Sequence, residues 1–144
     1  MNDQKVNHAP LDMREHLERL EAKGLLTRID EPVNKDTQLH PLVRWQFVGG
    51  LAETERRAFM FTNVFGADGR KFETPVVVGV FAANPEIYAV GMGASVENIG
   101  DVWNRGIAVP IEPVQVDNPP CQEVVIKGED LRKPGGGLGS LPIP

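Results

Sequence analysis

Histidine, serine and cysteine are the side chains of this sequence that could support catalysis or metal binding. The histidines are His8, His16 and His40. Two metal ligands on one helix face need an i, i+3 or i, i+4 spacing, which no two of these histidines have. The spacing therefore predicts no metal site, and we expect His16 and His40 to be surface residues on helices.

Two serines and the single cysteine are the candidate nucleophiles. Ser95 lies in GASVE and Ser140 in LGSLP, and neither sequence completes the Gly-x-Ser-x-Gly turn that exposes a nucleophile. We expect Ser95 to cap a helix instead. Cys121 opens a predicted strand, where a thiol packs as a small apolar group, and no histidine is partnered with it. These residue types therefore predict no nucleophile.

Glycine-rich, acidic and aromatic positions give no sign of a site either. The glycines in GMGASV and GGGLGS fail the dinucleotide fingerprint, and the first follows a predicted helix where that motif requires a strand. Trp45 and Trp103 occupy helical positions, so packing in a core or interface is favoured over ligand stacking. Three acidic pairs fall in predicted loops and are interpreted as solvated charge: Asp30 with Glu31, Glu53 with Glu55, and Glu129 with Asp130.

Composition limits the classes of protein that this chain can belong to. The chain has 144 residues, 41% of them hydrophobic, which suffices for one core but hardly for two. A net charge of −5 argues against a nucleic-acid or anionic-membrane surface, which needs clustered Lys and Arg. A single cysteine and the lack of a charged-then-apolar leader or long apolar span favour a cytoplasmic protein.

The stretch from Pro75 to Gly93 is predicted to organise the fold. Its first part, 76–81, is nearly continuously apolar, as a central strand buried on both faces is. Asn84 then offers a cap to a helix that begins at Pro85 and ends at Gly93. Strand, tight turn and capped helix make the first half of an α/β unit.

Apolar periodicity and turn signals predict the remaining elements. Further helices are expected from Asp12 to Gly24, from Asp36 or Thr37 to Gly49, and from Ser95 to Gly106. Four side chains of the second helix are expected to face the core: Leu39, Leu42, Val43 and Phe47. Strands are predicted at 25–29, 58–64 and 121–127, the strand at 58–64 lying beside the one at 76–81. The fold class is α/β, with a small mixed sheet flanked by helices.

A rise in proline and glycine after Gly106 marks a boundary. Residues 1–10 are polar and unpatterned and are predicted to be a disordered leader, and residues 11–108 to be an N-terminal α/β domain. Prolines 110 and 113 make 109–116 an extended segment that cannot lie in the middle of a sheet. Residues 109–144 are therefore interpreted as a connector and the beginning of a further domain.

Several stretches, in their order and spacing, resemble the N-terminal region of the UbiD-type carboxy-lyases, which are prenylated-FMN-dependent decarboxylases. They are DMREHLERLEAKGLLTRIDEPV at 12–33, FMFTNVFG at 59–66, PVVVGVFAANPEIYAVGMG at 75–93, PPCQEVVIKGEDL at 119–131 and LPIP at 141–144. The resemblance implies a non-oxidative, reversible decarboxylase of an aromatic or α,β-unsaturated carboxylic acid. It also implies prenylated FMN with Mn²⁺ and K⁺, a flavin prenyltransferase that supplies the cofactor, and a homodimer or hexamer.

The resemblance further implies how such an enzyme would be divided. The strand at about Cys121 would be the first of a split β-barrel flavin domain, truncated here. The family's Glu-Arg-Glu set, its cofactor contacts and its metal ligands would lie beyond LPIP. No catalytic, cofactor-binding or metal-binding residue is therefore assigned, and the 144-residue piece alone is expected to be inactive.

The resemblance gives this domain a supporting role, in which the modified flavin supplies the chemistry and the protein supplies position and electrostatics. The domain would wall the cleft and help it close, with the helix that carries Tyr88 and Met92 at the junction with the flavin domain. The alternative is a non-catalytic protein-interaction or assembly module that shares this domain. A small flavin-binding protein is disfavoured because no phosphate cradle is visible in the sequence.

Overall fold

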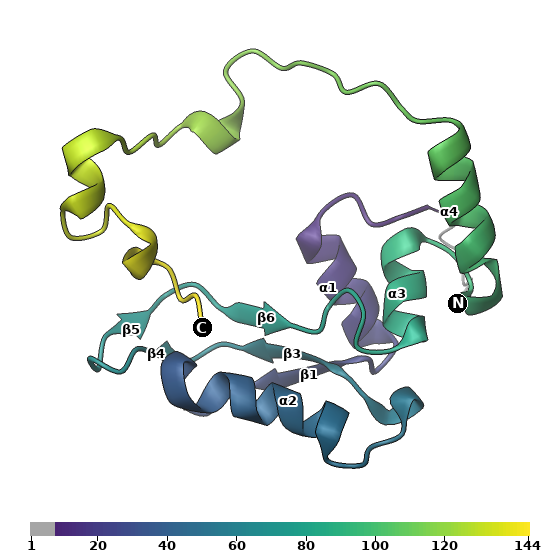
Figure 1. Ribbon diagram of the computed structural model, residues 1–144, viewed down its shortest axis with the longest axis horizontal. Coiled ribbons are helices and arrows are strands. Elements are labelled where there is room, and N and C mark those ends of the chain that lie inside the picture. Colours follow the sequence, from purple (N-terminus) through teal and green to yellow (C-terminus); the bar gives the residue numbers. More distant parts are fainter. Residues whose placement is uncertain (1–7) are drawn as a thin grey trace.

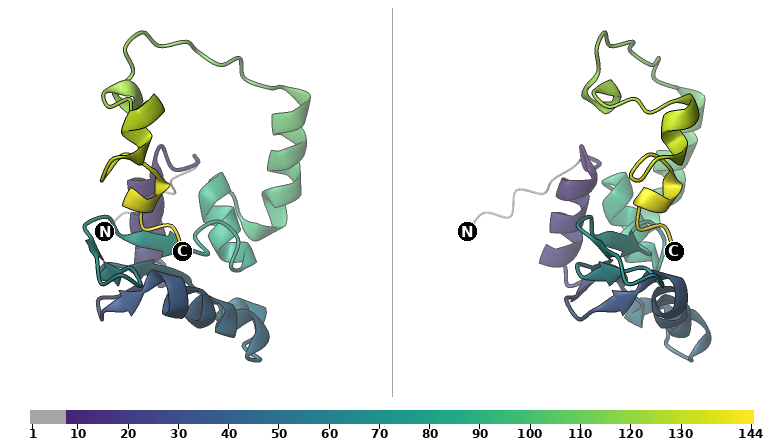
Figure 2. Two further views of the ribbon diagram at one scale, coloured as in Figure 1. Left: turned by 60° about the vertical axis from the view of Figure 1, so that its left-hand side comes forward. Right: turned by 90° about the vertical axis from the view of Figure 1, so that its left-hand side faces the viewer.

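The computed structural model describes residues 8–144, so the leader predicted at 1–10 lies mostly outside the described residues. The folded part has a thin layer of strands between helices (Figure 1). Helices α1 (Met13–Ala22) and α3 (Pro85–Met92) pack on one side of the strands, and α2 (His40–Val48) packs on the other (Figure 2). This mixture of helices and small mixed sheets confirms the predicted α/β fold class.

The strands within residues 8–144 form two three-stranded sheets. They are β1 (Leu26–Ile29), β2 (Val33–Asn34), β3 (Ala58–Phe61), β4 (Val64–Phe65), β5 (Lys71–Phe72) and β6 (Val76–Val78). The strand orders are β1-β3-β6 and β2-β4-β5, and each sheet joins one parallel pair to one antiparallel pair. The pairing of Phe59 with Val78 confirms that the strands predicted at 58–64 and 76–81 are neighbours.

The central strand of the first sheet is β3, so the prediction that 76–81 forms a central strand buried on both faces is wrong. β6 contains only Val76–Val78, pairs with β3 alone among the described strands, and is half-buried throughout. Gly79 follows with φ of +74°, a conformation that glycine adopts without steric cost, and it ends the strand. Val80 and Phe81 therefore lie in the turn that leads to α3.

Two apolar clusters, one on each side of the strands, hold the layers together. The cluster beneath α1 and α3 contains Leu20, Leu25, Ala58, Val80, Ala83, Ile87 and Val90. The cluster beneath α2 contains Val33, Leu39, Val43, Phe61, Val64 and Phe72. Because successive side chains of a strand point to opposite faces, β3 contributes Ala58 to the first cluster and Phe61 to the second.

The inward face of α2 differs from the prediction in two of its four residues. Leu39 and Val43 are buried as expected, but Leu42 and Phe47 are 48% and 42% exposed. Gln46 takes the third inward position, because its side-chain amide donates to the Arg57 carbonyl at 3.0 Å and accepts from the Arg57 amide at 2.9 Å. Backbone pairing by a glutamine thus replaces apolar contact at this end of the helix.

The start of this helical segment is also earlier than predicted. The Asn34 side chain accepts hydrogen bonds from the amides of Asp36 and Thr37, so Asn34 is the cap rather than either of those residues. The first turn, Lys35–Leu39, is π-helical and leads directly into α2. The proline at position 41 fits here because it lies in the first turn of α2.

The chain beyond α3 makes few contacts with the layers. Val96–Asn98 forms a 3₁₀ turn before α4 (Ile99–Ala108), and 110–116 is extended as predicted. The strand predicted at 121–127 is wrong: Pro120–Gln122 is a 3₁₀ turn, and the following residues are irregular and exposed. A strand requires a paired edge, and no described strand lies beside this segment. No helix within residues 8–144 is long and apolar enough to cross a membrane.

Truncation of Phe61 should be the most damaging single change on the α2 side of the strands. Phe61 is fully buried, and Phe61→Ala leaves a cavity between the central strand and α2. We expect the free energy of unfolding to fall by about 3–5 kcal/mol in urea denaturation. Ile111→Ala, at a position that is 94% exposed, should stay within about 0.5 kcal/mol of wild type. A loss below about 1 kcal/mol for Phe61→Ala would show that this core is not formed.

A pH-dependent contact should stabilise the start of α1. The Glu15 amide donates to the Asp12 carboxylate at 2.9 Å, and the Glu15 carboxylate accepts from the Leu11 amide and pairs with Arg19. The Leu11 amide, followed by Arg19, holds the pKa of Glu15 below its ordinary value. A lowered pKa in the folded state stabilises the fold above the unfolded-state pKa, and that contribution disappears as the pH falls through the folded value.

Glu15→Gln should therefore lower the unfolding temperature at neutral pH and have a much smaller effect in acid. Wild type and variant would be compared by thermal unfolding at pH 7 and at a pH below the lowered pKa of Glu15. Glu18→Gln, at an exposed position of the same helix, is the matched control. Equal destabilisation at both pH values would contradict the assignment.

Candidate functional site

A small pocket opens between the start of α1 and the outer side of α3. Its volume is about 280 Å³, and its lining residues are Pro10, Asp12, His16, Phe81, Tyr88, Gly91 and Met92. The hydrogen bonds of Asn84 fix the start of α3, which forms one side of the pocket. The Asn84 side chain accepts a hydrogen bond from the Ile87 amide at 2.9 Å and donates one to the Arg56 carbonyl at 2.7 Å. Gly93, with φ of +61°, closes the helix as predicted. The pocket thus lies beside the helix that carries Tyr88 and Met92.

His16 is buried in the wall of this pocket, so the prediction that it is a surface residue is wrong. Only 3% of His16 is exposed, and its ring stacks on Phe81 with centroids 5.9 Å apart. Its Nε2 lies 2.6 Å from the Val80 carbonyl oxygen. A carbonyl can only accept, so Nε2 carries the proton and donates this bond. His16 thereby fixes the turn between β6 and α3.

The sequence contained a signal for the burial of His16. Positions 13, 16, 17 and 20 recur at helical spacing, and Leu20 at the end of this series is fully buried. His16 therefore lies on the inward stripe of α1. The residue type alone suggested solvent, but its position on the helix favoured the core.

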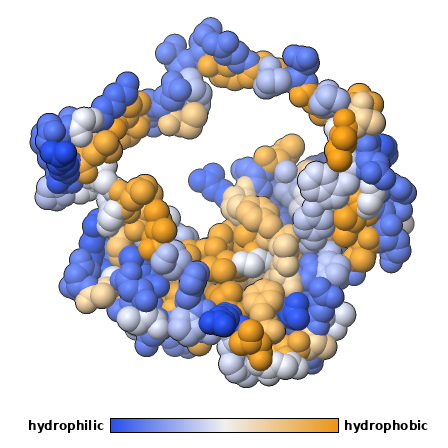
Figure 3. Space-filling view, in the orientation of Figure 1, coloured by the Kyte–Doolittle hydropathy of each residue, from blue (hydrophilic) through white to orange (hydrophobic). Residues whose placement is uncertain are grey.

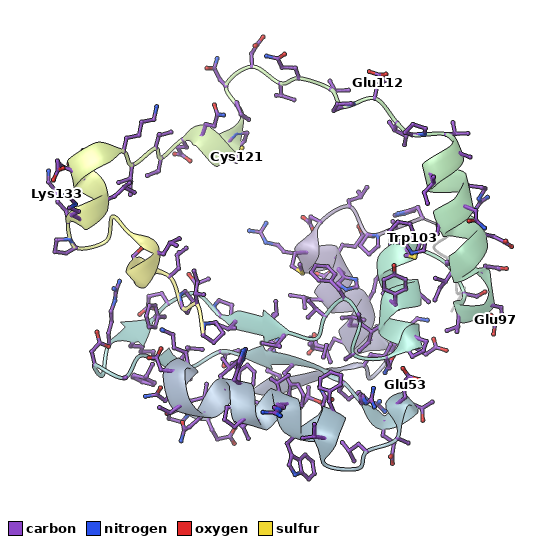
Figure 4. All side chains as sticks on the ribbon, viewed as in Figure 1. Glu53, Glu97, Trp103, Glu112, Cys121 and Lys133 are labelled. Atoms are coloured by element: carbon purple, nitrogen blue, oxygen red, sulfur yellow. The ribbon has the colours of Figure 1, made fainter. Side chains whose placement is uncertain are left out.

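Tyr88 links α3 to the helix that follows it. The indole nitrogen of Trp103 on α4 donates to the Tyr88 hydroxyl, and Trp103 is labelled beside α3 in Figure 4. Trp103 remains 50% exposed and Trp45 is 61% exposed, so neither is a core residue of the described chain. For these two tryptophans, packing in a core is wrong and packing in an interface stays a prediction.

The other candidate residues do not assemble into a reactive group. Ser95 occupies the cap position before the 3₁₀ turn, but its hydroxyl makes no hydrogen bond to the backbone amides of that turn. Hydrogen bonds to the Glu97 carboxylate, first from the Glu97 amide and then from the Ser95 hydroxyl, lower the pKa of Glu97. Ser140 donates to the Gly137 carbonyl at 2.6 Å. Cys121 is exposed, so its predicted burial in a strand is wrong. His40 is exposed as predicted, and so are the residues of the three acidic pairs.

The pocket offers shape and apolar contact and lacks a pair of groups for acid–base chemistry. Its only carboxylate, Asp12, is already engaged as the α1 cap. Within residues 8–144, no group of three or more His, Cys, Asp and Glu side chains is placed to hold a metal ion. This arrangement suits a surface that packs against another domain or positions a ligand.

The comparison with protein families identifies the chain. Residues 17–104 match the model of the 3-octaprenyl-4-hydroxybenzoate carboxy-lyase N-terminal domain, UbiD_N. The match spans more than half of the chain and covers the second half of α1, all of α2 and α3, both sheets and the first part of α4. The chain therefore belongs to the UbiD carboxy-lyase family, of which it contains the N-terminal domain. No solved structure gives a significant match.

The His16 contact should contribute measurably to the stability of this domain. His16→Ala removes a hydrogen bond to a carbonyl beside the core and the stack on Phe81, so we expect a loss of about 2–4 kcal/mol in urea denaturation. Arg14→Ala, an exposed position on the same helix, should change stability by less than about 0.5 kcal/mol. If both variants unfold at the wild-type midpoint, the buried placement of His16 is wrong.

Proposed function

We propose that this chain is the N-terminal domain of a non-oxidative, reversible decarboxylase that acts on an aromatic or α,β-unsaturated carboxylic acid with prenylated FMN. The match of residues 17–104 to the N-terminal domain of the carboxy-lyase family carries this proposal. The complete enzyme would assemble as a homodimer or hexamer in the cytoplasm and receive its cofactor from a flavin prenyltransferase. Residues 109–144 would connect this domain to the flavin-binding split barrel.

The described residues do not fit prenylated FMN, Mn²⁺ or K⁺ as ligands of this domain. They contain no cluster of three metal-ligating side chains, and the pocket beside α3 has no cation to face a phosphate. We therefore assign the cofactor to the flavin domain of the complete protein and the supporting role to residues 11–108. A domain with this role contributes to turnover by excluding water from the cleft and by keeping the walls of the cleft in fixed positions around the reacting groups.

The outer surface of α3 is the part of this domain best suited to meet the flavin domain. Phe81 is 61% exposed, and the half-buried side chains of Tyr88 and Met92 continue the same apolar surface. These residues rest on a rigid base, because His16 and Asn84 hold the turn and the helix start beneath them. A large apolar side chain left in water on a firmly held surface is typical of a contact with another domain.

The first test asks whether the source protein is a flavin enzyme. The protein purified from its native host would be examined by intact mass and by absorbance spectroscopy. A mass well above the 15.8 kDa of this chain, together with the spectrum of a bound modified flavin, is the expected result. A flavin-free protein of 15.8 kDa without a partner that supplies a flavin domain would favour the non-catalytic assembly module.

The second test addresses the α3 surface in the complete enzyme. Tyr88→Ala and Met92→Ala should each lower turnover by about tenfold at saturating substrate, because small displacements of a cleft wall disturb the geometry of reaction. Turnover and flavin content would be measured together. Glu86→Gln, an exposed position of the same helix, should leave both unchanged. Wild-type turnover and cofactor loading in both alanine variants would show that α3 does not lie at the junction with the flavin domain.

A further inference from the structure

Two cationic side chains of the β2-β4-β5 sheet region hold the segment 138–144, which we call the tail. Lys35, at the start of the π-helical turn, donates from Nζ to the Ile143 carbonyl at 2.9 Å. The guanidinium of Arg70, just before β5, donates to the Gly139 carbonyl at 3.2 Å. The two contacts join residues that are 108 and 69 positions apart in the sequence. Figures 1 and 2 both show the C-terminal end beside the strands.

The chain between α4 and the tail has no comparable support. Within residues 8–144, the bonds from Lys35 and Arg70 are the only hydrogen bonds that join 110–144 to the helix and strand layers. In the space-filling view, the chain after α4 stands away from the layers around an open gap and returns to them at the tail (Figure 3). The contacts of Lys35 and Arg70 therefore decide whether the end of this long excursion is held or free.

The two cations are fixed before the tail reaches them. Lys35 Nζ and the guanidinium carbon of Arg70 lie 5.9 and 5.0 Å from the centre of the Phe72 ring, which attracts them electrostatically. Phe72 itself is buried in the cluster beneath α2. Lys35 Nζ also donates to the Asp36 carboxylate at 2.6 Å, and that carboxylate accepts from the Ala67 amide at 2.8 Å. Donors held in this way lose little conformational freedom when they bind a carbonyl.

The tail is also restricted by its own sequence. Leu138–Ser140 forms a 3₁₀ turn, and the Ser140 hydroxyl donates to the Gly137 carbonyl at 2.6 Å. Pro142 and Pro144 each fix one backbone φ angle. A chain with few accessible conformations loses less entropy on docking than a flexible one. Rigid donors and a restricted tail together favour a single docked position.

Hydrogen bonding to the tail backbone specifies that position more than apolar burial does. Leu141 and Ile143 remain 48% and 50% exposed, so their side chains gain only part of the free energy of burial. Both hydrogen bonds from the sheet end on backbone carbonyls, at Gly139 and Ile143. The contact therefore selects the path of the chain.

We propose that the edge formed by Lys35, Phe72 and Arg70 is a docking surface for the tail, and that Lys35 and Arg70 are positioning residues. The docked tail, rather than the chain from 110 to 137, would fix the point from which the flavin domain of the complete enzyme begins. The docking itself is a property of this chain. Its effect on the flavin domain rests on the proposed function.

Backbone dynamics of the 144-residue chain test the docking directly. In wild type, the ¹⁵N order parameters of the Gly139, Leu141 and Ile143 amides should be about 0.8 or higher, as in ordered backbone. The double variant K35M/R70M keeps apolar stems against Phe72 and removes both donors, so these order parameters should fall below about 0.6.

A matched variant separates the loss of these contacts from the loss of charge. R14M/K71M removes the same two positive charges at exposed positions, one of them beside Arg70, and should leave the tail as ordered as in wild type. Circular dichroism should show the wild-type fold in both double variants. A mobile tail in wild type, or a tail equally ordered in K35M/R70M, would overturn the docking.

The complete enzyme tests the positioning role. Double electron–electron resonance would measure the distance between one spin label attached through Glu18→Cys and a second label on the flavin domain. The distance distribution should broaden in K35M/R70M and stay as in wild type in R14M/K71M. An unchanged distribution in K35M/R70M would refute the positioning role. A source protein without a flavin domain would refute the proposed function instead and leave the order parameters of the tail as they are.

Discussion

The burial of β3 on both faces is the constraint on which the rest of the structure depends. Successive side chains of a strand between two helix layers point alternately to one layer and the other. Ala58 is buried in the cluster beneath α1 and α3, and Phe61 is buried in the cluster beneath α2. β1 pairs with β3 in parallel and β6 pairs with it antiparallel. The position of β3 therefore determines where both helix layers pack.

Local signals in the sequence predicted the helices well because caps act within a few residues. The side chains of Asp12 and Asn84 each accept a hydrogen bond from the backbone amide of the residue three positions later in the chain. Gly93 adopts the left-handed conformation that ends a helix. Each of these bonds joins residues that are close in the sequence, so the pattern of residue types suffices to predict it. The α1 and α3 boundaries therefore agree with the prediction, and the same reasoning failed for α2, where Asn34 caps an unexpected π-helical turn.

The sequence predicted strand order and burial less well because both depend on distant partners. The run at 76–81 looks fully buried by composition, yet its outer edge has no partner strand among the described residues. The run at 121–127 has strand-forming residues but no strand beside it within residues 8–144. His16 in the candidate site is a mixed case: its helical spacing with Leu20 favours the core, whereas its hydrogen-bond partner, the Val80 carbonyl, is distant in sequence.

Exposed apolar residues lie on both sides of the strand layer, beside different helices. Phe81 on one side of the strands and Trp45 on the other are each 61% exposed. The two surfaces have different chemistry: the first is almost uncharged and held by buried hydrogen bonds, and the second is cationic. The two surfaces can therefore make different kinds of contact, since an apolar wall gains free energy from burial and a charged surface gains it from opposite charges. The three-layer fold separates them because one strand layer gives each its own supporting helix, so that a change at one surface need not disturb the other.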